Sequence, residues 1–367
     1  SCPPRPSSWL FQSQGFELII RYNPDFEQAM LSGTNTLLAT TPVRITNTSK
    51  PKVLWVGDAL IPTGFGKVTD HFCRHLDRKG WDVHVLGIGY NGDPHDRPYR
   101  VYPAGSGSRS VPRMQEVVHC VKPDLMVVHD DHWNVGLIVD DMAAHNIYVP
   151  TIGYLAVDSE NVRADIVTQL RNLKYAVCHT QFGADQLAAA GYIGTCDIVG
   201  HGVDTDLFCP QDRIRARAGI VAERKNIQIA NAFIWGAVAM NQPRKRLDLT
   251  IAYFAEWWKK AGCPNAYLYI HTNANGVWDL RQLADHCGIR GRLLATEGSM
   301  TETQLPHLYS AFDAMISTAE GESWSLTNME GMACGVAQIA VKCGGMPCWA
   351  DDAVCWVEPS FYAFTAN

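Results

Sequence analysis

The stretch KVLWVGDALIPTGFGKVTDHFCRHLDRK, residues 52–79, predicts the fold class. It opens with a short apolar run at 52–57, passes through a turn that contains Gly64 and Gly66, and continues at 67–79 with apolar residues at helical spacing. A buried strand, a tight turn and an amphipathic helix together form the repeating unit of parallel α/β sheets. We therefore expect this stretch to open a parallel sheet.

The same alternation of apolar strand and helix recurs along the chain. Short continuous apolar strands that alternate with helices indicate parallel sheets covered on both faces. Helices are expected, for example, at 247–261 and at 301–312, the second opening with a Thr301-x-x-Gln304 capping box. The further strands are predicted at 83–87, 125–129, 151–154, 176–179, 233–238, 266–271, 292–295, 314–317, 338–341 and 354–357.

Length and repetition together predict two domains. A chain of 367 residues exceeds one ordinary domain. We expect an N-terminal extension or linker at 1–50, with a short strand at 16–21, then doubly wound domains at 51–205 and 206–367 that face each other across a cleft. The last predicted strand is followed by no closing helix, so we expect the second domain to be incomplete.

Composition favours a globular cytoplasmic protein. Hydrophobic residues make up 47% and charged residues 19% of the chain, no long apolar run could span a membrane, and the first residues lack signal-peptide features. The 12 cysteines are scattered without a CxxC pair, which predicts buried free thiols, for example Cys178, Cys334 and Cys355. The net charge of −6 gives no global attraction to nucleic acid.

The most informative motif is ESWSLTNMEGMACG, residues 322–335. Glu322 and Glu330 frame a loop that enters a helix near Leu326. A helix start offers free backbone N–H groups and a positive dipole end to a diphosphate, and the flanking carboxylates can accept hydrogen bonds from sugar hydroxyls. The alternative is that Glu330 is an ordinary surface or capping residue.

Three motifs carry a resemblance to a known family. The 322–335 stretch, GHGVDTDLFCP at 200–210 and AMNQPRKRLD at 239–248 resemble the retaining glycosyltransferases of the GT-B class, the group that contains the glycogen synthases. The family forms are E-G-F-G-L-x-x-x-E, N-G-V-D-x-x-x-F-x-P and G-R-L-x-x-x-K-G-x-D. The resemblance covers roughly 52–359, and some local patterns are similar to phage-encoded members. It implies two Rossmann-like domains, an acceptor bound by the first, and a nucleotide sugar, favoured to be a UDP-sugar, bound by the second.

The resemblance also implies roles for individual residues. Glu330 would hold the donor ribose, Glu322 would approach the transferred sugar, and Lys245 would neutralise the leaving diphosphate. The other residues implied to bind the donor are Gly64, Gly66, Arg244, Arg246, Ser323, Trp324, Ser325, Leu326 and Thr327.

The chain departs from the family pattern at the donor site. Ser323 and Ser325 stand where the family has glycine, and Met240 stands where it has arginine. Serine adds bulk and removes backbone freedom where the backbone must approach a ligand. We expect an altered fit to the sugar or a lower turnover, and we keep open a catalytically weak sugar- or nucleic-acid-binding protein on the same scaffold.

In the first domain, the segment His129-Asp130-Asp131-His132 follows a predicted strand. Its side chains could bind zinc, form a structural loop or line the cleft; the last reading makes Asp131 and His132 catalytic. Asp158, after the next strand, is expected to face the acceptor.

The last two expectations from the sequence concern the need for a metal ion and the kind of acceptor. Asp204-Thr205-Asp206 fits the D-x-D pattern of metal-dependent glycosyltransferases, but loop capping explains Asp204, so we expect no metal and no cofactor besides the donor. The basic segment 97–113, with Arg109 and Arg113, is predicted to be a flexible loop that borders the acceptor side. It suits an anionic glycan, a lipid or a hydroxymethylated DNA base, unless it is only a solvated loop.

Overall fold

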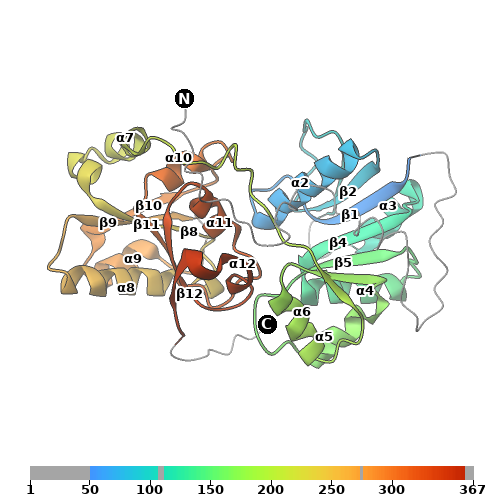
Figure 1. The fold of residues 1–367 in the computed structure, drawn as a ribbon. Helices are drawn as coiled ribbons and strands as arrows, with labels where there is room; N and C mark the ends of the chain where they lie inside the picture. The colour runs from blue at the N-terminus through green and yellow to red at the C-terminus, as the bar shows by residue number, and fades with distance from the viewer. Residues whose placement is uncertain (1–49, 106–110, 273–275, 360–367) are drawn as a thin grey trace.

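In the computed structural model, described for residues 50–105, 111–272 and 276–359, the chain forms two lobes side by side (Figure 1). The first lobe, blue to green, holds a seven-stranded sheet, and the second, yellow to red, holds a six-stranded sheet. All strand pairs in both sheets are parallel. The structure is therefore that of two Rossmann-like units, as the strand and helix alternation predicts.

The first sheet has the order β3-β2-β1-β4-β5-β6-β7. Its strands are β1 (Lys52–Asp58), β2 (Asp82–Ile88), β3 (Arg100–Pro103), β4 (Leu125–Asp131), β5 (Thr151–Ala156), β6 (Tyr175–Cys178) and β7 (Cys196–Ile198). The accompanying helices are α2 (Gly64–Arg78), α3 (Val111–Val121), α4 (His132–Ala144), α5 (Ala164–Gln169) with the short turn η2 (Leu170–Asn172), and α6 (Gln181–Ala189).

The second sheet has the order β10-β9-β8-β11-β12-β13. Its strands are β8 (Phe233–Val238), β9 (Ala266–Thr272), β10 (Leu293–Glu297), β11 (Ala314–Ser317), β12 (Ala337–Val341) and β13 (Val354–Val357). The α-helices are α7 (Arg213–Arg224), α8 (Leu247–Lys260), α9 (Leu280–His286), α10 (Leu305–Ser310), α11 (Leu326–Ala333) and α12 (Pro347–Ala350), and the 3₁₀ turns are η3 (Ile227–Asn231), η4 (Pro243–Lys245), η5 (Arg290–Arg292) and η6 (Asp351–Ala353).

Strand β1 shows how alternation buries both faces of the first sheet. Leu54 and Val56 pack in one cluster with residues of α3 and α4, whereas Val53 and Trp55 pack in a second cluster with residues of α2. Because successive strand residues point to opposite faces, a strand covered on both faces must be apolar throughout. This requirement explains why the strands read as continuous apolar runs in the sequence.

The order of the strands reverses once in each sheet. The neighbours β1 and β4 are far apart in sequence, and so are β8 and β11. The connections on the two sides of such a point lead away from each other, which leaves a crevice at the carboxyl ends of the two strands, where ligands of this fold bind. The fold thus places candidate sites after β1 and β4 and after β8 and β11.

The sequence analysis missed two strands and predicted one helix too long. The sequence did not predict β3 and β7, because both are short edge strands without a continuous apolar run. The predicted helix at 301–312 is reduced to α10, which carries Pro306 in its first turn, a position that suits proline because the helix start leaves that N–H unpaired anyway. The predicted strand at 16–21 lies outside the described residues.

The cysteine prediction holds in part. Cys178 and Cys334 are buried as expected, but Cys355 is exposed. Cys355 lies on β13, which among the described residues pairs with β12 alone and forms an edge of the second sheet. Cys355 and Val357, on the same face of this apolar strand, are exposed. No helix among the described residues is long and apolar enough to cross a membrane.

Candidate active site

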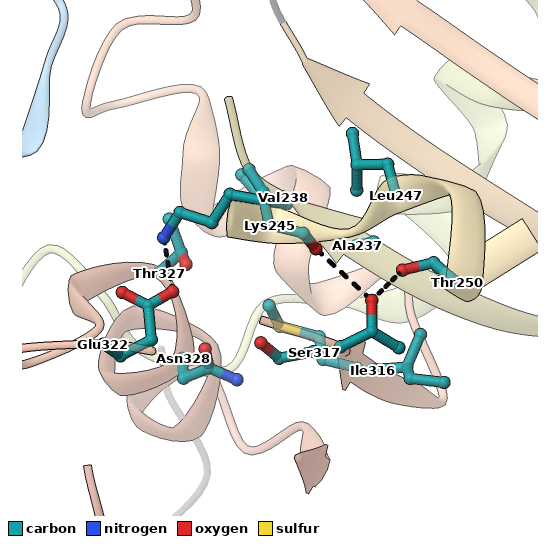
Figure 2. Close-up of a pocket in the computed structure, with 13 residues that line it drawn as sticks. Ala237, Val238, Lys245, Leu247, Thr250, Ile316, Ser317, Glu322, Thr327 and Asn328 are labelled. Atoms are coloured by element: carbon teal, nitrogen blue, oxygen red, sulfur yellow. Dashed lines mark hydrogen bonds and ion pairs between the residues drawn. The ribbon is translucent and has the colours of Figure 1, made fainter. Parts of the chain in front are cut away.

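A pocket lies at the point where the strand order of the second sheet reverses (Figure 2). Its walls come from the ends of β8 and β11 and from the first turns of α8 and α11. The lining residues are Ala237, Val238, Ala239, Lys245, Leu247, Thr250, Met315, Ile316, Ser317, Thr318, Glu322, Thr327 and Asn328. The motif residues Lys245, Glu322 and Thr327 therefore meet at one place.

Two cations and two carboxylates meet beside this pocket. Lys245 and Glu322 form an ion pair and point toward each other (Figure 2). Arg244 Nη1 lies 3.2 Å from Glu322 Oε2, and Arg244 Nε lies 3.0 Å from Asp158 Oδ2. Because Asp158 follows β5 in the first domain, Arg244 links the two domains directly at the site.

Burial dominates the electrostatics of this group. Burial lowers the pKa of Lys245, partly offset by Glu322. Burial by itself would raise the pKa of Glu322, but Lys245 and Arg244 outweigh it, so that pKa lies below its usual value. An anionic ligand that took the place of the Glu322 carboxylate would meet two partly desolvated cations, where charge interactions are stronger than in water.

The third cation of the basic turn does not join the site. Arg246 pairs with Glu320 and, at 2.9 Å, with Asp248. It has a left-handed backbone with φ of 48° at the junction between η4 and α8. Arg246 is therefore engaged by two neighbouring carboxylates, and its donor-binding role stays a prediction.

The donor loop, our name for residues 322–328, which the sequence predicts to bind the donor, is held by a chain of buried hydrogen bonds. Ser325 has φ of 72°, a left-handed conformation that favours glycine. Its hydroxyl donates to Asn328 Oδ1 at 2.6 Å, and Asn328 Nδ2 donates to Gln338 Oε1 at 2.9 Å. A glycine-type backbone is thus kept with a serine side chain, at a cost of about 1–3 kcal/mol for a non-glycine residue in this region.

Two side chains of the same loop face the first domain instead of the pocket. Ser323 Oγ accepts a hydrogen bond from Val157 N at 3.2 Å and lies 2.9 Å from His179 Nδ1. The Trp324 ring stacks on Trp349 at 5.3 Å between centroids and approaches His201 edge-on at 5.5 Å. Residues 323–326 do not line the pocket, so this stretch of the chain contributes Glu322, Thr327 and Asn328 to it.

Glu330 also lies at the domain interface. It is 3% exposed, and its Oε1 accepts a hydrogen bond from Lys67 Nζ at 2.7 Å while its Oε2 accepts one from the Tyr309 hydroxyl at 2.6 Å. Lys67 belongs to α2 of the first domain. Both oxygens of the carboxylate that the sequence assigns to the ribose are therefore already engaged.

The glycine turn of the first domain contacts the start of α11. A Cβ atom at Gly64 would lie 3.6 Å from Leu326 Cδ1 of the second domain, within ordinary contact distance. A Cβ atom at Gly66 would lie 2.3 Å from the carbonyl oxygen of Ile61, which no side chain tolerates. Gly66 thus has a structural reason to be glycine, and Gly64 lies at the interface.

The segment 129–132 separates into different roles. It does not follow its strand as the sequence suggested, since β4 runs on through Asp131 and His132 starts α4. Burial raises the pKa of Asp131 to about 7, helped by the nearby carboxylates of Asp158 and Asp130 and opposed by Arg244. His132 Nδ1 lies 3.0 Å from the carbonyl oxygen of Ala156, which fixes its ring to β5. His129 lies in a separate buried cluster, next to the rings of Tyr154 and His179.

In the described parts of the basic segment, 97–105 and 111–113, the structure has regular elements where the sequence predicts a flexible loop. The segment contains β3, and Arg113 lies in α3. Arg97 Nε lies 2.8 Å from Asp70 Oδ1, and Arg113 Nε lies 3.0 Å from Glu116 Oε2, so both guanidinium groups have acidic partners. Arg109 lies outside the described residues.

The D-x-D segment caps its own loop. Asp204 Oδ1 accepts hydrogen bonds from the backbone N–H groups of Asp206 and Leu207 at 3.0 and 3.3 Å. This is the loop-capping arrangement expected from the sequence.

Sequence reasoning missed four residues at the interface: Lys67, Tyr309, His179 and His201. Lys67 directly follows the glycine turn, and His201 stands where the family motif has asparagine, so both offered a signal. Tyr309 and His179 gave none, because each acts through a partner from a distant part of the chain, Glu330 and Ser323 respectively.

The second domain matches a family of known proteins. Residues 222–360 match the family model of glycosyl transferases group 1. The D-inositol 3-phosphate glycosyltransferase of Mycobacterium sp. (strain KMS) is 28% identical over 185 residues, which is 48% of this chain and 39% of that protein. The matched segment thus spans about two fifths of this curated relative.

Solved structures match most of the chain. Sucrose-phosphate synthase from Thermosynechococcus elongatus superposes with a TM-score of 0.69 at 16% identity, covering 85% of this chain and 87% of that one. Anabaena HepE, solved in complex with UDP and glucose, superposes with a TM-score of 0.61 at 17% identity, covering 81% and 82%. At such low identity the agreement establishes the shared fold, with its two facing Rossmann-like domains.

Proposed function

We propose, from the premise that residues 222–360 are a glycosyl transferases group 1 domain and that the chain has the GT-B fold, that this protein transfers a sugar from a nucleotide sugar to an acceptor hydroxyl. The observation that carries the proposal is the meeting of Lys245, Arg244 and Glu322 at the ends of β8 and β11, beside the first turn of α11. Such a group binds and stabilises a leaving diphosphate without a metal.

Transfer would proceed with retention of configuration at the sugar. The bond between the anomeric carbon and the phosphate oxygen breaks, and its electron pair stays on the diphosphate. Lys245, Arg244 and the backbone N–H groups at the start of α11 stabilise that charge. The acceptor hydroxyl attacks the same face of the sugar and gives its proton to the departing diphosphate.

A UDP-sugar is the donor that we favour, because the structurally similar HepE was solved with UDP and glucose. Its ribose hydroxyls would bind Glu330. Glu330 is 3% exposed and each of its oxygens already accepts a hydrogen bond, from Lys67 and from Tyr309, so we propose that donor binding displaces one of these partners. Displacement of Lys67 would loosen the contact between the domains, so we link donor entry to an opening of the interface.

The acceptor side is formed by Asp131 and Asp158, with Arg244 between them and the donor site. Carboxylates accept hydrogen bonds from hydroxyl groups, and Arg244 can pair with a phosphate. A relative is named for D-inositol 3-phosphate and a structural neighbour is a sucrose-phosphate synthase, both concerned with phosphorylated polyols or sugars. We therefore propose a small hydroxylated acceptor that carries a phosphate. Because Arg97 and Arg113 are paired internally, we rank modified DNA below it.

A second candidate is a catalytically weak sugar-binding protein on this scaffold. It is favoured by Met240, a 41% exposed side chain where the family has arginine, and by the serine at the left-handed position 325. Both features would slow the chemical step and leave the binding of the nucleotide largely intact.

One experiment separates these candidates. The purified protein is screened by thermal unfolding with UDP-, GDP- and ADP-sugars, since a ligand of the native state raises the melting temperature. The stabilising donor is then incubated with inositol phosphate, sugar phosphates and hydroxymethylated duplex DNA, and nucleotide release and labelled product are measured. Product with a phosphorylated polyol supports the proposal, and product only with DNA replaces its acceptor.

Binding without product would favour the second candidate. The absence of both binding and product in the native protein would overturn the proposed function. Lys259→Met, an exposed lysine on α8, is the matched control for Lys245→Met in these assays.

A further inference from the structure

Three histidines from separate parts of the chain meet inside the protein, next to the crossing between the domains. His129 lies on β4, His179 directly follows β6, and His201 lies on the segment that leads to the second domain. They are 0%, 3% and 5% exposed. One ring nitrogen of each lies within 4.8 Å of one ring nitrogen of each of the others.

The hydrogen bonds around the cluster leave nitrogen atoms unused. Among the described residues, both nitrogens of His129 and Nε2 of His179 are buried without a hydrogen-bond partner. Native proteins pair nearly all buried polar atoms, so three such atoms in one cluster require an explanation.

The tautomer of His201 can be inferred from its neighbours. The Tyr154 hydroxyl donates to the carbonyl oxygen of Val199 at 2.9 Å, which uses its single proton. The Tyr154 oxygen, 3.0 Å from His201 Nδ1, must therefore accept from an Nδ1–H group. The lone pair of His201 then lies on Nε2, on the side of the ring opposite to Tyr154.

We infer that His129, His179 and His201 bind a divalent transition-metal ion of the zinc type. In a tetrahedral site with zinc–nitrogen distances of about 2.0–2.1 Å, the ligand nitrogens lie roughly 3.4 Å apart, so closing the cluster onto an ion needs only small ring movements. The ring centroids are already 4.2, 5.7 and 6.2 Å apart. His179 Nδ1 would donate to Ser323 Oγ, a second contact of the kind that fixes a histidine ligand.

The ligand set selects the class of ion. Three imidazoles suit zinc, copper, nickel or iron, whereas magnesium and calcium prefer oxygen ligands. Burial lowers the pKa of His201 to about 3 and those of His129 and His179 well below the usual value, so the rings are neutral, as coordination requires. A water molecule or hydroxyl group would complete the four-coordinate site.

The position of the cluster suggests a structural role. An ion there would fasten two strands of the first sheet to the crossing segment through His201. Through the contact between His179 and Ser323 it would also reach the donor loop of the second domain. The inference is independent of the glycosyl transfer proposed above.

The test uses the whole protein after removal of metals with a chelator. Zinc binding is measured by calorimetry and metal content, cobalt binding by visible absorption, and the melting temperature with and without zinc. We expect one zinc ion per chain, an increased melting temperature, and a tetrahedral cobalt spectrum without thiolate charge-transfer bands.

The variants are chosen to fold without the metal. His129→Phe replaces a ring surrounded by Trp55, Phe65 and Tyr154, so it removes the ligand and keeps aromatic packing. We expect its zinc affinity to fall at least 100-fold, with no zinc-dependent change in melting temperature. His179→Gln should behave alike. His84→Gln, which changes a buried histidine on β2, is the matched control and should bind zinc like the native chain.

A pair of thiols supplies the competing explanation. Cys178 Sγ and Cys196 Sγ lie 3.0 Å apart, and thiolates also bind zinc. Cys196→Ser should leave zinc binding unchanged. The inference is overturned if the native chain binds no zinc at a 1:1 ratio, if His129→Phe binds zinc as tightly as the native chain, or if Cys196→Ser abolishes binding.

Discussion

Lys67 of helix α2 donates a hydrogen bond to Glu330 of helix α11, with Nζ 2.7 Å from Oε1 across 263 positions of sequence. This ion pair joins the two domains at the carboxylate that we assign to the donor ribose. Its side chains are 22% and 4% exposed, so it is largely shielded from water. In our proposal Lys67 and the donor compete for Glu330. We therefore expect substitution of Glu330 and substitution of Lys67 to change the donor affinity in opposite directions.

Glu330→Ala should weaken binding of the donor nucleotide by about 1.5–3 kcal/mol, the range for hydrogen bonds to a charged group. Calorimetric titration with the nucleotide found in the thermal screen measures this. Glu256→Ala, an exposed glutamate on α8, is the control and should leave the affinity unchanged. Equal affinities for Glu330→Ala and the native protein, with both folded, would remove Glu330 from the donor site.

Lys67→Met should have the opposite effect on the same titration. It removes the cation that, in our proposal, the ribose displaces from Glu330, so we expect binding to tighten about three- to tenfold, which is about 0.7–1.4 kcal/mol. Lys79→Met, at the end of α2, is the control on the same helix. A weaker affinity in Lys67→Met would show that Lys67 contacts the donor itself.

Lys245→Met should lower the turnover of donor cleavage by about 10²–10³-fold, the usual effect of removing one preorganised stabilising group. Arg244 remains and limits the loss. Initial rates of nucleotide release give the value, with Lys259→Met as control. If Lys245→Met changes only the KM, Lys245 binds the ground state and does not act in the transition state.

Transfer should not need magnesium. In the proposed mechanism Lys245, Arg244 and backbone N–H groups meet the diphosphate charge, so rates in excess EDTA, measured directly after its addition, should equal those in magnesium. A loss that magnesium restores would return Asp204 and Asp206 to consideration as ligands. A slow loss that zinc alone restores would instead indicate removal of an ion from the three-histidine cluster.

The contact between His71 and Glu302 should make domain contact depend on pH. The Glu302 carboxylate, 3.8 Å from His71 Nε2, raises the pKa of His71 against the opposing effect of burial, with smaller effects from Asp70 and Lys67. A raised histidine pKa stabilises the fold fully below the unfolded value of 6.5, and this stabilisation is lost as the pH rises through the folded value. The pKa of Glu302 is lowered below 4.5 mainly by its interaction with His71. The stability that this carboxylate contributes is therefore lost in acid, as the pH falls through its folded pKa.

His71→Gln tests this pH dependence. The two side chains are 42% and 37% exposed, so water weakens their interaction. The free energy of unfolding of the native protein should therefore exceed that of the variant by only about 0.2–1 kcal/mol near pH 6, and by less at pH 8.5. Urea unfolding at both pH values measures the difference. A constant difference between the two proteins would show that the pair carries no charge interaction.

The sequence by itself determined the strand and helix alternation and the place of the donor motif. Apolar strands such as 233–238 and 314–317 were predicted at the bounds of β8 and β11, because a strand buried on both faces must be apolar throughout. The loop after Glu322 was predicted to enter a helix near Leu326, where α11 begins, because local helix signals are enough to locate such a start.

Only the tertiary structure decided which charged groups meet. The sequence contains Arg244, Lys245 and Arg246 in a row, but the fold brings the first two to Glu322 and Asp158 and sends the third to Glu320 and Asp248. No local sequence pattern predicts that Lys67 pairs with Glu330 or that the three histidines lie together. Such contacts depend on the packing of distant elements, which sequence periodicity, reaching over a few residues, cannot specify.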